Sequence, residues 1–85
     1  RHIMYKIIPT KHVLKIRGNR SHSSHYSDIK NRTWTTPVKI GPRSSGWPEY
    51  EVIQLNQARI AGKSEEEVRE LVLQLEASRK NGGDV

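Results

Sequence analysis

The sequence predicts one small domain that is mainly helical and carries a single short β-hairpin. Its 85 residues are enough for one domain, and local signals for helix starts and for one hairpin turn predict the elements. Only 33% of the residues are apolar, 28% are charged, and Phe is absent. A chain of this size buries a small core, which argues against a large catalytic cavity.

The first residues predict an extended segment followed by a short helix. Residues 5–8 are apolar except for Lys6, and they fit a small strand or an extended lead-in. Thr10 is the predicted N-cap of a helix over residues 11–16, because its hydroxyl can accept a hydrogen bond from a free backbone N–H of the first turn. Gly18 follows, where the end of a helix favours a left-handed residue.

A second helix is predicted over residues 22–31, with Ser21 as its N-cap. At 100° per residue, its side chains divide into two faces. The semi-apolar face, which we expect to pack, holds His22, His25, Tyr26 and Ile29. The opposite face is small and polar, and it holds Ser23, Ser24, Ser27, Lys30 and Asn31.

A short β-hairpin is predicted next. Residues 38–40 alternate as a strand does, residues 41–46 form a turn-rich tip, and Trp47 lies in the returning strand. Trp34 and Trp47 are expected to anchor the core, and the alternative is that their rings stack on bases.

Two further helices complete the chain. The third begins at Pro48, whose fixed φ suits a first helical position, and it stops at Gly62. Ser64 and Glu67 form a capping box for the fourth helix, which is expected to end near Arg79 or Lys80.

The fourth helix carries an apolar stripe that allows two interpretations. Its residues recur at the i, i+3, i+4, i+7 spacing of one helix face: Val68, Leu71, Val72 and Leu75. The stripe can cover the domain's own core. Alternatively, the chain is a protein-interaction module whose C-terminal helix docks an integrase, a polymerase subunit or a second copy.

Four segments follow from this organisation. Residues 1–3 precede Met4, which we expect to be the natural start, with the three residues left over from expression. Residues 4–62 are predicted to form the main domain, and residues 63–80 a helix that packs on it or extends it. The Gly-rich residues 81–85 are expected to be a disordered tail.

Charge is unevenly distributed along the chain, whose net charge is +6. Residues 1–47 carry ten Lys and Arg against one acid, Asp28, while residues 48–85 carry five against eight Asp and Glu. A basic half joined to an acidic half predicts a surface for a polyanion on a separate scaffold. The alternative is a generic solubilising charge.

Two short helices, a glycine-containing turn and a following hairpin predict a winged helix-turn-helix that binds double-stranded DNA. Short polar side chains on the second helix allow close approach to base edges. The residues expected there are His22, Ser23, Ser24, Ser27, Lys30 and Asn31. Phosphate contacts are expected from Lys11, Arg17, Arg20 and Arg32. The wing is expected to contribute Lys39, Arg43, Ser44 and Ser45, with Arg43 entering a minor groove.

Other function classes find little support. The absence of Cys excludes disulfides, thiolate zinc sites and thiol catalysis, and it fits a reducing cytoplasm. His22 and His25 have half of a metal-site spacing without a completing ligand, so we expect no metal, and we expect His25 to pack in its neutral form. Neither a phosphate loop nor a nucleophile elbow is visible. We therefore expect a protein that is not an enzyme, binds no cofactor and does not enter a membrane.

The hairpin region is similar to the AlpA family of small prophage regulators, which resemble phage excisionases and other MerR-like winged helix proteins. Residues 36–52, TPVKIGPRSSGWPEYEV, match the family's Pro-Val-Lys-Leu-Gly strand, Arg tip and Gly-Trp return. Residues 21–26 match the start of its recognition helix, with His22 where the family has Arg and His25 where it has an apolar residue.

This resemblance, which covers about residues 5–80, implies a sequence-specific DNA-binding protein of a mobile element. Such proteins act as recombination directionality factors, which bend DNA near an attachment site and help an integrase to assemble, or as transcriptional regulators. Cooperative self-association on DNA and a location on the bacterial nucleoid in the cytoplasm are expected accordingly.

Overall fold

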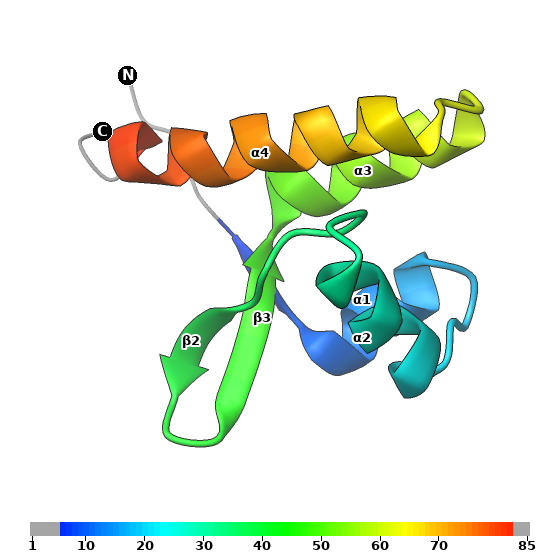
Figure 1. Ribbon diagram of the computed structural model, residues 1–85. Coiled ribbons are helices and arrows are strands. Elements are labelled where there is room, and N and C mark those ends of the chain that lie inside the picture. The colour runs from blue at the N-terminus through cyan, green and yellow to red at the C-terminus, as the bar shows by residue number, and fades with distance from the viewer. Residues whose placement is uncertain (1–5, 83–85) are drawn as a thin grey trace.

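The computed structural model describes the backbone of residues 6–82 and the side chains of residues 6–79. Along the chain the elements are β1 (Ile7–Pro9), α1 (Thr10–Ile16), α2 (His22–Lys30), β2 (Val38–Gly41), β3 (Ser44–Pro48), α3 (Glu49–Ile60) and α4 (Glu65–Gly82) (Figure 1). The described part is thus mainly helical with one small sheet, as predicted. No helix in it is long and apolar enough to cross a membrane. Residues 1–3 and the expected start at Met4 lie outside the described residues.

The three strands form one antiparallel sheet in the order β1-β3-β2. The predicted hairpin is β2 and β3, with Lys39 opposite Ser45 and an irregularity in register between Lys39 and Gly41. On its other edge β3 pairs with β1, which places Ile8 opposite Trp47. Figure 1 shows the hairpin projecting away from α4.

The predicted capping residues of α1 and α2 are confirmed except for the N-cap of α1. Pro9 is the N-cap of α1, and the predicted cap Thr10 is the first helical residue. Its hydroxyl donates instead to the Ser45 carbonyl oxygen at 3.2 Å, because β3 lies next to the start of α1. The predicted cap of α2 is confirmed, since Ser21 Oγ accepts from the Ser24 backbone N–H at 3.2 Å. Gly18 has a φ of +83°, as predicted.

The capping box of α4 is confirmed in both directions. The Ser64 backbone N–H donates to Glu67 Oε1 at 3.0 Å, and the Glu67 backbone N–H donates to Ser64 Oγ at 3.2 Å. The helix continues to Gly82, so the first two residues of the predicted tail are helical and the other three lie outside the described residues.

The core lies between the sheet and the helices and is centred on Trp34 and Trp47, which are 2% and 0% exposed. The prediction that both tryptophans anchor the core is therefore confirmed. The other buried apolar residues of this cluster are Ile8, Val13, Val52, Leu55, Val72 and Leu75, with Val68 and Leu71 packed against them. The apolar stripe of α4 thus covers the domain's own core.

Candidate nucleic-acid interface

The corner between α1 and α2 is held by one carboxylate. Asp28 Oδ2 accepts from Arg17 Nη2 at 2.6 Å and from Arg20 Nε at 2.7 Å, while Oδ1 accepts from Arg20 Nη2 at 3.1 Å. Burial opposes the charged form of Asp28, but the hydrogen bonds from Arg20 and Arg17 outweigh it and hold the pKa of this carboxyl below its usual range. These ion pairs fix the orientation of α2 relative to α1.

Beneath this corner, His25 is fully buried between aromatic rings. Its ring meets Trp47 edge-on with centroids 4.7 Å apart, and Trp34 at 5.8 Å. Arg17 Nη1 lies 2.6 Å from His25 Nδ1, and because a guanidinium can only donate, Nδ1 accepts and the ring proton belongs on Nε2. Burial and the Arg17 charge lower the pKa of His25 to about 4, in agreement with the expected neutral histidine.

The opposite side of α2 is open to solvent. We call the exposed residues Ser23, Ser27, Lys30 and Asn31 the polar face of α2. Within residues 6–79 none of their side chains forms a hydrogen bond, whereas the carbonyl oxygen of Asn31, the C-cap of α2, accepts from Arg69 Nε at 2.9 Å. Ser24 differs from its predicted neighbours, because it is half-buried beside the N-cap. His22, predicted to contact DNA, is exposed. Tyr26 was predicted to pack and is exposed, so His25 and Ile29 are the residues of that face that contact the core.

The hairpin supplies a second exposed polar surface. Lys39, Arg43 and Ser44 are exposed, and we call them the hairpin tip. Arg43 forms no ion pair with any residue that the structure describes. Ser45, also predicted to act here, is half-buried, and its carbonyl oxygen accepts from Thr10 of α1.

Of the predicted phosphate contacts, Arg17 requires a correction. Its side chain is 1% exposed and is bonded to Asp28 and His25, so it is an internal residue. Burial also lowers the pKa of Arg17 from its usual value. The Arg20 side chain is 29% exposed and already paired with Asp28. Arg32 is exposed, and its Nη1 lies 3.8 Å from Glu76 Oε1 of α4. Lys11 is exposed on α1, as the prediction requires.

Sequence reasoning missed the structural role of Asp28. The signal was present, since Asp28 is the only acid among residues 1–47 and therefore the only nearby counter-charge for the arginines that precede it. A second missed pair is Glu51 with Arg79, which has no signal in the sequence because 28 residues separate them.

Glu51 of α3 connects Arg79 of α4 with Thr35, which lies in the loop before β2. This carboxylate is 0% exposed and accepts from Arg79 Nε and Nη2, each at 2.7 Å, and from Thr35 Oγ1 at 2.8 Å. The Trp47 indole N–H donates to the Thr35 carbonyl oxygen at 2.8 Å. Burial lowers the pKa of Arg79, but the hydrogen bonds from Arg79 to the Glu51 carboxylate outweigh burial and raise it. The hairpin is thereby fixed relative to the helices.

No family model matches the chain, and neither a curated protein nor a solved structure is significantly similar to it.

Proposed function

We propose that the chain binds double-stranded DNA as a winged helix-turn-helix protein. The polar face of α2 would lie in the major groove, and the hairpin tip would bring Arg43 to an adjacent minor groove. One observation carries the proposal: the side chains of the polar face are short or flexible, exposed and unpartnered, on a helix whose other side is anchored by Asp28 and His25. Base edges need donors and acceptors that can approach closely and are not already bonded.

The charge of the surface supports the same function. Among the residues predicted to contact DNA, four exposed cations form no ion pair within the described residues: Lys11, Lys30, Lys39 and Arg43. If each neutralises one phosphate, the logarithm of the affinity for a random duplex should fall against the logarithm of salt concentration with a slope of about −3.6. Fluorescence anisotropy over a series of salt concentrations measures this slope.

Single variants test the proposed placement. Arg43→Ala should weaken binding to the random duplex and reduce the salt slope by about 1, because one phosphate-region contact is lost. Lys63→Ala removes the same charge from an exposed residue at the α3–α4 corner, and it should bind within about twofold of the unchanged protein. Equal losses in the two variants would show that net charge, rather than the hairpin tip, drives binding.

A second pair of measurements separates base reading from phosphate binding. A variant with both Ser23→Ala and Ser27→Ala should bind a random duplex unchanged, since it keeps every cation. It should lose about tenfold or more of its preference for a duplex selected by the unchanged protein from a random pool, because base contacts carry the sequence information. Unchanged preference would place the reading surface elsewhere.

The resemblance to AlpA proteins extends the proposal to the regulation or excision of a mobile element. Footprinting on DNA from around the element's attachment site and integrase promoter distinguishes the two roles. Protection beside the attachment site with DNA bending supports a recombination directionality factor, and protection over the promoter supports a transcriptional regulator. Uniform protection without preferred sites would contradict both.

A further inference from the structure

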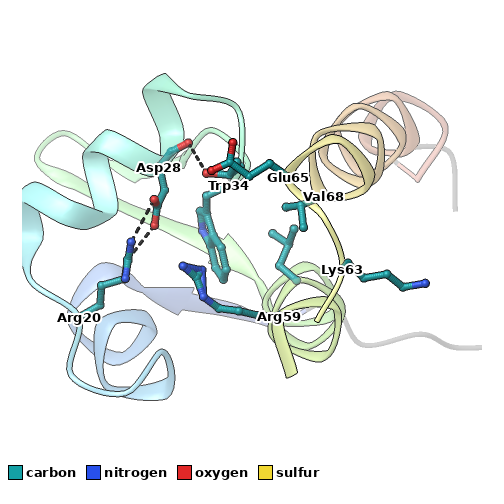
Figure 2. A pocket seen from close by; sticks show the side chains of 9 residues that line it. Arg20, Asp28, Trp34, Arg59, Lys63, Glu65 and Val68 are labelled. Carbon is teal, nitrogen blue, oxygen red and sulfur yellow. Dashed lines mark hydrogen bonds and ion pairs between the residues drawn. The ribbon is translucent and has the colours of Figure 1, made fainter. Parts of the chain in front are cut away.

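A cleft lies outside the proposed DNA-binding surfaces, between the α1–α2 corner and the α3–α4 corner. It has a volume of about 370 Å³, and Figure 2 shows the side chains that line it. Trp34, Leu55 and Val68 form apolar walls. The charged groups of the lining are those of Arg20, Arg59 and Lys63 and the carboxylates of Asp28 and Glu65. In Figure 2, Arg59 reaches toward the Trp34 indole, whereas the ammonium of Lys63 points away from it.

The surroundings of Trp34 hold more hydrogen-bond donors than acceptors. The indole Nε1 of Trp34 and Nε of Arg17 are buried and have no partner within the described residues. Arg20 uses Nε and Nη2 on Asp28, which leaves its Nη1. The exposed Arg59 forms neither a hydrogen bond nor an ion pair within the described part of the chain. Buried donors without acceptors cost free energy, and of the two residues with such a donor Trp34 lines the cleft.

Positive charge also accumulates around the same indole. The guanidinium carbon of Arg17 lies 4.0 Å from the Trp34 ring centroid. Burial contributes most to the lowered pKa of Arg17, and the positive charges of Arg20 and Arg59 lower it further. Asp28 is the one carboxylate that pairs with these guanidiniums within residues 6–79. A negatively charged ligand would offset the remaining repulsion.

We propose that this cleft binds a small organic anion, a carboxylate or phosphate carried on an apolar body. The anionic group would pair with Arg59 and the remaining donors of Arg20, and the apolar body would lie against Trp34, Leu55 and Val68. The volume of the cleft lies within the range of small-molecule sites, and its lining offers three apolar side chains beside charged ones. This inference uses neither the polar face of α2 nor the hairpin tip, and of the predicted phosphate contacts it uses only Arg20, which is paired with Asp28.

The test uses three probes with one planar body: benzoate, phenyl phosphate and the neutral benzamide. Two-dimensional NMR of the full chain should show one indole N–H signal for each of the two tryptophans. The Trp47 indole N–H donates a hydrogen bond in the structure, and the Trp34 indole N–H has no partner within the described residues. Benzoate or phenyl phosphate should shift the Trp34 signal saturably and leave the Trp47 signal nearly unchanged. Benzamide should bind at least about tenfold more weakly, since it lacks the charge that pairs with Arg59. Comparing the two anions distinguishes a carboxylate site from a phosphate site.

Two matched variants complete the experiment. Arg59→Gln should weaken binding of the preferred anion about tenfold or more, because it removes the main unpaired cation of the cleft. Lys63→Gln removes the same charge nearby from a side chain that points away, and it should leave binding within about twofold. Equal effects of the two variants, saturation by benzamide as tight as by benzoate, or absence of a saturable shift would overturn the proposal. A loss of duplex affinity in Arg59→Gln as large as in Arg43→Ala would instead assign the cleft to DNA and also overturn it.

Discussion

At the scale of single residues, Asp28 connects α1 to α2 through its bonds to Arg17 and Arg20. Asp28→Asn should destabilise the fold by about 3 kcal/mol, because it leaves the Arg17 guanidinium, 1% exposed, buried without its counter-charge. Urea denaturation followed by circular dichroism measures this change. Glu66→Gln neutralises an exposed acid and should change stability by less than about 0.5 kcal/mol. Equal midpoints for the two variants would contradict a structural role for Asp28.

His25 makes the stability of the protein depend on pH. Burial holds its pKa at about 4 in the folded state against 6.5 for the ordinary side chain, so the unfolded state takes up the proton first as the pH falls. The free energy of unfolding should therefore be unaffected by His25 above about pH 6.5, and it should decrease by up to about 3 kcal/mol as the pH falls toward 4.

Urea midpoints measured across this pH range test the assignment. The variant His22→Gln should keep the dependence, since His22 is exposed, and His25→Met should flatten it because no titrating group remains at that position. An undiminished slope in His25→Met would assign the dependence to other groups.

At the scale of elements, the sheet depends on the close approach of β1 to β3 at Gly46. A Cβ at this position would lie 2.6 Å from the Ile8 carbonyl oxygen, which would force the strands apart. Gly46→Ala should therefore destabilise the protein by about 1–3 kcal/mol, as measured by thermal denaturation.

Gly41→Ala is the matched control in the neighbouring strand. The nearest atom to its Cβ would be Ser44 Cβ at 3.7 Å, an ordinary contact. This variant should stay within about 1 kcal/mol of the unchanged protein. If Gly46→Ala were equally mild, β1 would not be packed against β3 as the structure has it.

At the scale of the whole molecule, α4 belongs to the same core as the sheet. Val72 and Leu75 are buried in that core, and Arg79 supplies the counter-charge for the fully buried Glu51. A chain that ends at Lys63 should therefore be largely unfolded by circular dichroism, because it exposes the core and leaves Glu51 unpaired. Leu73→Ala, on the exposed side of α4, should keep the full chain folded. A cooperatively folded truncated chain would contradict this interdependence.

Exposed cations and acids also lie on different parts of the molecule. The exposed cations of the proposed DNA-binding surfaces come from α1, α2 and the hairpin, whereas the acids of α4 lie on the helix that Figure 1 shows on the other side from the hairpin tip. An acidic helix near DNA would repel its phosphates, so this separation is what a polyanion-binding surface requires.

The sequence by itself determined the elements and most of the exposed face of α2. The Ser21 cap, the Ser64–Glu67 capping box and the left-handed Gly18 depend on hydrogen bonds and backbone preferences within a few residues, so local patterns predicted them. The exposure of Ser23 and Ser27 followed from helical periodicity.

Only the tertiary structure decided which polar groups are internal. Thr10 bonds Ser45, Arg17 is buried against Asp28 and His25, and the pairing of Glu51 with Arg79 joins residues far apart in the chain. The cleft beside Trp34 likewise combines residues from the α1–α2 turn, α2 and the loop after it, and both C-terminal helices. The number of cations in a segment can be counted from the sequence. Which of those cations are exposed to solvent depends on the free energies of burial and of ion pairing, and these depend on neighbours that only the fold brings together.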